Sequence, residues 1–154
     1  MGRASASIEV PGLASEAEAL WYDPVRWAAW IDGFGHVVEL SGDWPAAGTL
    51  RWDSTPEGRG RVLETVTAYE PRGGQSLAVE DSRLRGTQRV EFEPRHQAVH
   101  VRLTLEYEIK DRNPLTPVVD LLFVRRAWND ALRRTVTRFS NERKAEIQFG
   151  PDLR

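Results

Sequence analysis

The chain has 154 residues, of which 40% are hydrophobic and 29% are charged, a composition typical of one globular domain rather than of a disordered segment. Its formal charge of −2 gives no overall attraction to nucleic acid or to an anionic membrane, and no apolar run is long enough to insert stably in a bilayer. The absence of cysteine excludes disulfides, thiolate nucleophiles and cysteine metal sites. Because the N-terminus also lacks the apolar core of a signal peptide, we expect a single domain over residues 1–154 in the cytoplasm.

The beginning of the chain predicts one strand and two short helices. Small and β-branched residues over 4–10 indicate a strand that a Pro-Gly pair ends. Ser15 and Glu18 form a capping-box pattern, which predicts a helix to about Tyr22. An Asp-Pro pair then starts a second helix, which we expect to end near Ile31 because two glycines follow.

Tryptophan is concentrated in the same part of the chain. Trp27 and Trp30 lie three residues apart, so they share one face of the second helix. Aromatic side chains at this density form either an ordinary core or the wall of a cavity for a flat, apolar molecule. Five of the six tryptophans fall in the first third of the sequence: Trp21, Trp27, Trp30, Trp44 and Trp52.

The middle of the chain predicts an antiparallel sheet. Short segments rich in Val, Thr, Leu and aromatic residues alternate with Gly, Pro, Asp and Asn. Apolar and polar residues alternate strictly in the last segment, so we expect Val101, Leu103 and Leu105 to face the C-terminal part of the chain, after a turn over residues 94–97. The predicted strands lie near residues 36–41, 48–54, 59–69, 75–80, 86–93 and 98–110.

The C-terminal part predicts one long amphipathic helix of roughly 30 residues, or about 45 Å. It begins at Asn113-Pro114 or at Thr116-Pro117 and ends before Gly150. The stripe predicted to face the sheet consists of Val118, Leu121, Leu122, Arg125, Trp128, Leu132, Thr135, Val136 and Phe139. The other face either is solvated or docks on anionic lipid or RNA, and it carries Arg126, Arg133, Arg134, Arg138 and Lys144.

Four polar residues fall on faces that are otherwise apolar: Glu64, Gln88, Tyr107 and Arg125. Gln88 is in phase with Val90 and Phe92, whereas the strand that carries Glu64 could turn either face inward. A buried polar group without a partner costs about 1–3 kcal/mol, so these residues should meet one another or a ligand. The alternative is that Arg125 reaches the helix edge and the Tyr107 hydroxyl reaches water. If it is buried, Arg125 should pair with Glu64 or meet a ligand oxygen at a cavity mouth.

Motifs of catalysis or cofactor binding are not recognisable. His36, His96 and His100 show no ligand spacing with one another or with a carboxylate, so we predict no metal site. The serines lack the context of a hydrolase nucleophile. The segments GRGRV and PRGGQ contain glycine but do not match a phosphate loop, so we predict no cofactor.

The order of the predicted elements resembles the helix-grip fold of the START-like, or SRPBCC, superfamily, which includes polyketide cyclase/dehydrase and lipid-transport proteins. The resemblance runs from Ser7 to about Lys144. It implies an α+β, Bet v 1-like fold in which a curved antiparallel sheet of about seven strands surrounds a long C-terminal helix, with two short helices after the first strand. The segments that carry it are DPVRWAAWIDGFGHVVELSG, PAAGTLRW, RVLETVTAYEPRGGQSLAVE and LRRTVTRFSNERKAE.

The resemblance also implies a cavity between sheet and helix that binds a hydrophobic, polyketide-, lipid- or aromatic-like small molecule. Such a protein would be a carrier, a sensor or a cofactor-independent polyketide cyclase/aromatase- or dehydratase-like enzyme, with Arg125, Tyr107, Glu64 and Gln88 as catalytic candidates. The expected ligand-binding residues are Trp27, Trp30, Trp52, Glu64, Gln88, Phe92, Leu103, Tyr107, Arg125 and Trp128.

The alternative is a non-catalytic protein-interaction module of the same fold with a small or empty cavity. A cavity below about 300 Å³ would favour it. In either case we expect a monomer or homodimer that does not bind nucleic acid.

Overall fold

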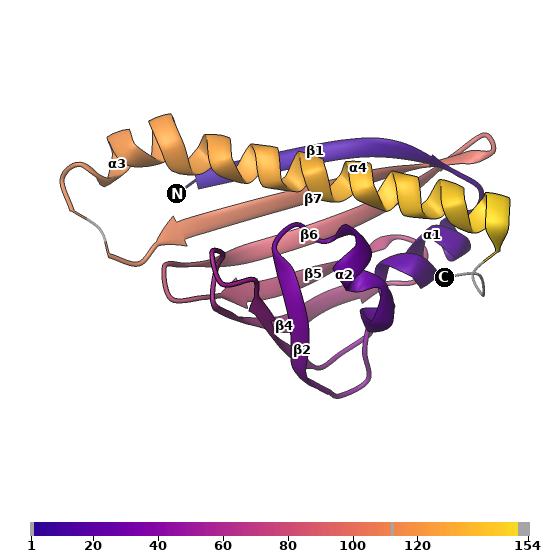
Figure 1. The fold of residues 1–154 in the computed structure, drawn as a ribbon, viewed down its shortest axis with the longest axis horizontal. Coiled ribbons are helices and arrows are strands. Elements are labelled where there is room, and N and C mark those ends of the chain that lie inside the picture. Colours follow the sequence, from indigo (N-terminus) through magenta and orange to yellow (C-terminus); the bar gives the residue numbers. More distant parts are fainter. Residues whose placement is uncertain (1, 112, 151–154) are drawn as a thin grey trace.

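Seven antiparallel strands form one sheet in the order β1-β7-β6-β5-β4-β3-β2 (Figure 1). The structure is a computed structural model that describes residues 2–111 and 113–150. The strands β2 to β7 form a meander, and β1 pairs with β7 at the opposite edge. This architecture confirms the predicted fold class. The strands are β1 (Gly2–Pro11), β2 (Phe34–Ser41), β3 (Thr49–Ser54), β4 (Arg61–Glu70), β5 (Gly74–Glu80), β6 (Leu84–Arg95) and β7 (Ala98–Ile109).

The β6–β7 hairpin has the inward face that alternation predicted. Val101, Leu103 and Leu105 are each at most 2% exposed, which confirms the predicted register. The turn is tighter than expected, because pairing continues to Arg95 opposite Ala98. Only the two residues between them turn the chain, both with positive φ, as in the short hairpin turns whose twist matches that of the strands.

Strand β4 changes its inward face along its length. Its first half buries Val62 and Glu64 and leaves Thr65 exposed, which decides the orientation that the sequence left open. The pairing with β5 then shifts by one residue beyond Val66. Such a bulge reverses which side chains point inward. Tyr69 accordingly lies on the inner side, with its ring 5.8 Å from that of Tyr22.

The short helices after β1 are α1 (Ala14–Trp21), the 3₁₀ turn η1 (Pro24–Arg26) and α2 (Trp27–Trp30). The predicted capping box of Ser15 and Glu18 is wrong, because the N-cap of α1 is Leu13, two residues before Ser15. The Leu13 N–H donates to Glu16 Oε1 at 2.9 Å. Glu18 instead accepts a bond from the backbone N–H of Arg72. The second start signal is confirmed, since the side chain of Asp23 accepts a bond from the N–H of the residue two positions later.

The C-terminal helix is continuous through three segments: α3 (Thr116–Val119), the π turn η2 (Asp120–Val124) and α4 (Arg125–Phe149). The second half confirms the predicted stripe, with Leu132, Thr135, Val136 and Phe139 buried. The first half contradicts it, because Val118, Leu121 and Leu122 are 54%, 62% and 52% exposed. The π turn holds an extra residue, which rotates the preceding segment about the helix axis. The buried residues of this first half are Thr116 in α3 and Asp120 at the start of the π turn.

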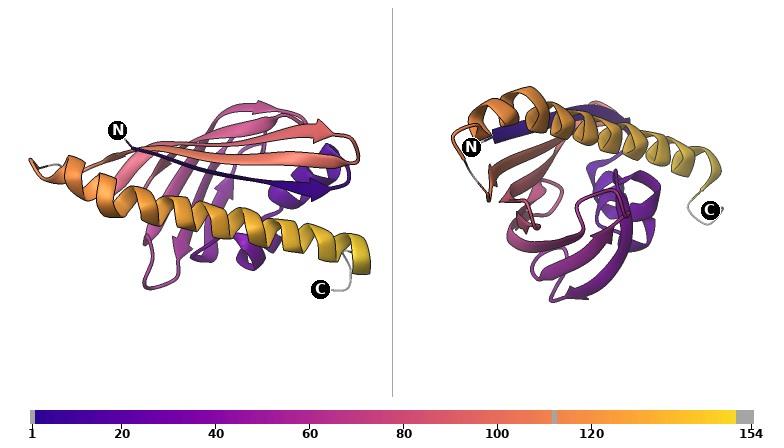
Figure 2. Two further views of the ribbon diagram at one scale, coloured as in Figure 1. Left: turned by 90° about the horizontal axis from the view of Figure 1, so that it is seen from above. Right: turned by 60° about the vertical axis from the view of Figure 1, so that its left-hand side comes forward.

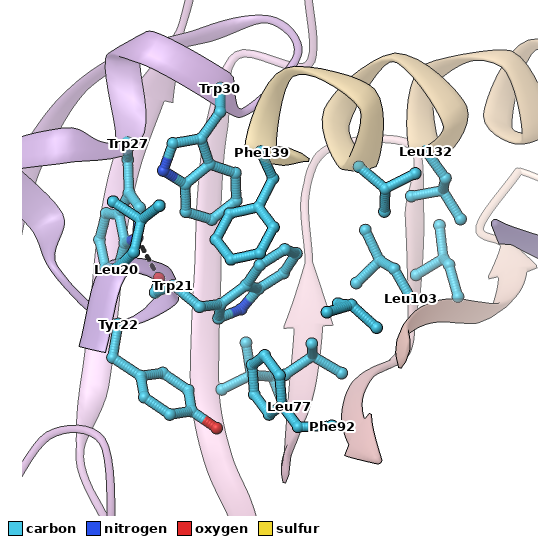
Figure 3. Close-up of a cluster of buried hydrophobic side chains, with 14 of the residues drawn as sticks. Leu20, Trp21, Tyr22, Trp27, Trp30, Leu77, Phe92, Leu103, Leu132 and Phe139 are labelled. Carbon is cyan, nitrogen blue, oxygen red and sulfur yellow. Dashed lines mark hydrogen bonds between the residues drawn. The ribbon is translucent and has the colours of Figure 1, made fainter. Parts of the chain in front are cut away.

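The helix runs along β1 and β7, while the sheet curves away from it toward β2 (Figure 2). The two short helices lie at the end of the sheet near the C-terminal part of α4 (Figure 1). Trp21, on α1, is the centre of the packing there. Its ring centroid lies 4.4 Å from that of Trp30 and 5.0 Å from that of Phe139 (Figure 3). The aromatic cluster therefore joins the short helices to α4.

Part of the basic face of α4 is paired within the chain. Arg134 and Arg138 both bond Asp32, at 3.0 and 3.1 Å. Arg133 pairs with Asp130 on the helix itself at 3.6 Å. These bonds lend no support to a dedicated lipid or RNA surface. Among the described residues, no helix is sufficiently long and apolar to cross a membrane.

Candidate ligand-binding site

An interior cavity of about 70 Å³ lies between α2, α4 and the inner face of the sheet. All six tryptophans of the chain line it, including Trp44 from the β2–β3 loop and Trp128 from α4. Their clustering in the sequence therefore reflects both core packing and a cavity wall. The polar residues of the lining are Asp32, Arg59, Glu64, Gln75, Gln88 and Thr135.

Seven of the ten residues expected to bind a ligand line this cavity: Trp27, Trp30, Trp52, Glu64, Gln88, Leu103 and Trp128. The other three lie elsewhere. Phe92 packs against Trp21 and Tyr22 in the aromatic cluster. Tyr107 and Arg125 meet beneath the first turns of the C-terminal helix, beyond the cavity wall.

Tyr107 and Arg125 share a partner that the sequence analysis missed. The Tyr107 hydroxyl donates to Asp120 Oδ1, and Arg125 Nη2 donates to Asp120 Oδ2 at 3.1 Å. Burial and the neighbouring carboxylate raise the pKa of Tyr107. The predicted pair of Arg125 with Glu64 is therefore wrong, and so is the inward position of Arg125, whose side chain is 39% exposed. The three groups fasten the π turn to β7. The sequence contains one signal for this contact: Asp120 is the only charged residue within the apolar run TPVVDLLFV.

Glu64 is a buried carboxyl group inside the cavity. It is 6% exposed, and Trp52 Nε1 donates a hydrogen bond to its Oε1. Loss of hydration raises the pKa of Glu64, while the Trp52 bond and the charge of Arg59 act in the opposite direction. Desolvation is the largest of these effects, so the site favours the protonated form more than water does.

Arg59 separates this cavity from a second hollow. Its Nε donates to Asp81 Oδ2 at 2.8 Å. Its guanidinium carbon lies 4.8 Å from the ring centroid of Trp128 and 5.7 Å from that of Trp52. Arg59 was not among the predicted site residues. The sequence placed it at the start of a strand over residues 59–69, whereas β4 begins at Arg61 and Arg59 lies in the loop before it.

On the far side of Arg59 and Trp128 lies an outer groove of about 450 Å³. It opens between the β3–β4 loop, the β5–β6 turn, the end of β7 and the C-terminal helix. Its apolar wall consists of Leu84, Ile109, Val124, Ala127 and Trp128. Its charged residues are Glu57, Arg59, Asp81, Arg83 and Asp111. Arg59 and Trp128 line both hollows, so displacement of either side chain would connect them.

Within residues 2–111 and 113–150, no three His, Cys, Asp or Glu side chains are grouped so that they could hold a metal ion. His36 lies 3.6 Å from Asp53, and its side chain is 69% exposed, so this pair faces solvent. We see no constellation for metal or nucleophilic chemistry among the described residues around the cavity.

The family model of polyketide cyclase / dehydrase and lipid transport proteins matches residues 1–142. The chain belongs to this family. This family member has no match among curated proteins, but its fold recurs in many solved structures. The Zhui aromatase/cyclase from Streptomyces sp. R1128 superposes with a TM-score of 0.76 at 9% identity, over 98% of each chain.

Two further structures show the same fold as this polyketide cyclase/dehydrase and lipid-transport family member. A START superfamily protein from Mycobacterium smegmatis has a TM-score of 0.75 at 15% identity, over 94% of this chain and 98% of that one. The protein TTHA0849 from Thermus thermophilus has a TM-score of 0.76 at 16% identity, over 93% and 97%. At these identities the likeness shows the fold alone, so function has to be argued from the site.

Proposed function

We propose that this chain binds a flat, hydrophobic small molecule in the outer groove, with one end of the molecule against the wall formed by Arg59 and Trp128. The observation that carries the proposal is the apolar groove of about 450 Å³ beside an aromatic cavity that shares this wall. Small-molecule sites are apolar hollows of about 300–1,000 Å³ with a few polar groups that orient the ligand. The groove falls within that range and has a largely apolar wall, whereas the interior cavity lies below the range.

The interior cavity is too small to hold such a ligand by itself, since its volume is about 70 Å³. The proposed binding position therefore differs from the one expected from the sequence. The sequence placed the ligand wholly between the sheet and the helix, whereas we propose that it lies in the outer groove. Trp128 is half-buried and lines both hollows, so its ring offers an apolar surface to a molecule in the groove. Of the four predicted catalytic residues, only Glu64 and Gln88 line the cavity. The proposal is limited to binding, and it requires no cofactor.

A groove-filling substitution tests the proposal. Ala127 is exposed and lines the groove, so Ala127→Phe places a ring within it and obstructs it without disturbing the core. Thr137→Phe adds the same ring at an exposed position of α4 that lines neither hollow. We expect calorimetric titration with 2-ethylnaphthalene to show binding to the wild type and to Thr137→Phe, and a loss of at least about tenfold for Ala127→Phe. Equal affinities for all three proteins would place the ligand elsewhere.

Native mass spectrometry of freshly purified protein adds an independent measurement. A co-purified small molecule that is released on denaturation, and that is absent from Ala127→Phe, would support the groove as the site. The same molecule bound equally to Ala127→Phe would contradict it.

Two observations favour a non-catalytic protein-interaction module as the second candidate. The interior cavity is far below the usual size of a ligand site. Large apolar side chains also gather, exposed, at the start of the C-terminal helix: Leu115, Val118, Val119, Leu121, Leu122 and Phe123. If the wild type binds neither 2-ethylnaphthalene nor a co-purified molecule, this candidate replaces ligand binding. A monomeric or homodimeric state and a cytoplasmic location remain predictions.

A further inference from the structure

The guanidinium of Arg59 has an unused hydrogen-bond donor at the boundary between groove and cavity. Its Nε is bonded to Asp81, and its two aromatic neighbours are Trp52 and Trp128. Its Nη2 is buried, and none of the described residues accepts a hydrogen bond from it. A buried donor of a charged group left without a partner is unfavourable, so an oxygen atom that reached Nη2 would gain binding energy there.

The position of this donor is set by the structure around it. The Asp81 side chain is 3% exposed and also accepts bonds from the backbone N–H groups of Arg83 and Leu84, at 2.8 and 2.9 Å. The carboxylate is thus held at the β5–β6 turn, and it holds the Nε edge of the guanidinium. A donor that is already oriented costs little to order when a ligand binds.

The charges around Arg59 distinguish between kinds of oxygen acceptor. Asp81 already compensates its positive charge. Two arginines and three carboxylates line the groove, and the carboxyl group of Glu64 lies on the cavity side. A ligand carboxylate would bring a further negative charge beside Asp81 in a poorly hydrated place. A ketone or similar neutral oxygen accepts the same bond without that repulsion.

We infer that Arg59 Nη2 selects flat apolar ligands that carry a neutral oxygen acceptor over carboxylates of the same shape. The inference rests on the proposed function, because it requires the groove to hold the apolar part of the ligand. It assigns to Arg59 a role in specificity, by direct contact with the ligand, and leaves the apolar affinity to Trp128 and the groove wall.

Three test ligands of one shape separate these contributions: 2-acetylnaphthalene, 2-naphthoate and 2-ethylnaphthalene. For the wild type we expect calorimetry to give a dissociation constant about tenfold lower for the ketone than for the hydrocarbon, as one hydrogen bond to a charged group can supply. The carboxylate should bind more weakly than the ketone. Arg59→Met should abolish the preference for the ketone, so that 2-acetylnaphthalene and 2-ethylnaphthalene bind this variant with dissociation constants equal within about threefold.

Arg59→Met leaves the buried Asp81 carboxylate without its cationic partner, which could destabilise the protein. A second variant therefore removes this unpaired charge. The double variant Arg59→Met/Asp81→Asn removes that charge and keeps an oxygen for the backbone bonds of the turn. Arg61→Met is the matched control, because Arg61 lies two residues further along, is 59% exposed and pairs with Asp53. The control should retain the wild-type preference, and thermal melting should show that all variants are folded.

The outcomes distinguish the two proposals. If the wild type binds all three ligands equally, or if the double variant retains the preference for the ketone, the role of Arg59 is refuted while binding in the groove stands. Tighter binding of 2-naphthoate than of 2-acetylnaphthalene also refutes it. If none of the three ligands binds, both proposals are rejected.

Discussion

Phe139 is the side chain through which the C-terminal helix joins the aromatic cluster, and Phe139→Ala should destabilise the protein strongly. The ring is fully buried, with its centroid 5.0 Å from that of Trp21 and 5.2 Å from that of Trp30. An aromatic side chain that buries about 150 Å² at about 25 cal/mol per Å² contributes about 4 kcal/mol. Large-to-small substitutions of buried Phe cost about 3–5 kcal/mol, which agrees.

The assay is urea unfolding followed by tryptophan fluorescence, with Phe123→Ala as the control on the same helix. Phe123 is 66% exposed, so its loss should change the free energy of unfolding by less than about 0.5 kcal/mol. Thermal melting should show a decrease of roughly 8–16 °C for Phe139→Ala, at about 2–4 °C per kcal/mol for a chain of this size. A loss below about 1.5 kcal/mol for Phe139→Ala, or equal losses for the two variants, would refute the packing described here.

Three further predictions concern the cavity and the sheet. Because burial raises the pKa of Glu64 above its ordinary value of 4.5, the wild type should lose stability relative to Glu64→Gln as the pH rises from about 4.5 through that raised pKa; a pH-independent difference in urea unfolding would contradict this. Trp128→Ala should cost about 1–2 kcal/mol, less than a core tryptophan, and weaken binding of 2-ethylnaphthalene; a loss of about 4 kcal/mol or more with unchanged binding would make the residue core. Gly86→Ala should lower the free energy of unfolding by more than about 2 kcal/mol, because the added Cβ would lie 1.9 Å from the carbonyl oxygen of Glu106. An unchanged melting temperature would show that the two strands can separate at this point.

The sheet and the second half of the C-terminal helix were predictable because their side-chain periods are local and regular. Val101, Leu103 and Leu105 alternate with polar residues, and this alternation alone predicts which face of the strand is buried. The start of the helix was not predictable in the same way. The apolar residues Leu121 and Leu122 suggested burial, but the π turn rotates the segment so that Asp120 points to Tyr107 instead.

The candidate site was predictable only where its residues lie on regular elements. Trp52 lies on a strand and Trp128 on a helix whose periodicity indicated an inward side chain, and both line the cavity. Glu64 also lines it, but the sequence left open which face of its strand points inward. Arg59 lies in a loop, so neither its direction nor its contact with Asp81 follows from spacing. Long-range pairs of polar groups depend on how the strands assemble, and a single sequence gives no direct information about that.

The most direct test of ligand binding in the outer groove is an NMR titration of the tryptophan indole N–H signals with 2-acetylnaphthalene. The signals of Trp52 and Trp128, assigned through Trp→Phe variants, should move most, because these rings flank Arg59 at the boundary of groove and cavity. The indoles of Trp27 and Trp44 donate to backbone carbonyls, at 2.7 and 3.0 Å, and should move least. Saturable shifts at Trp52 and Trp128 are the predicted result. Unchanged signals at both, at ligand concentrations near its solubility limit, would contradict binding in the groove.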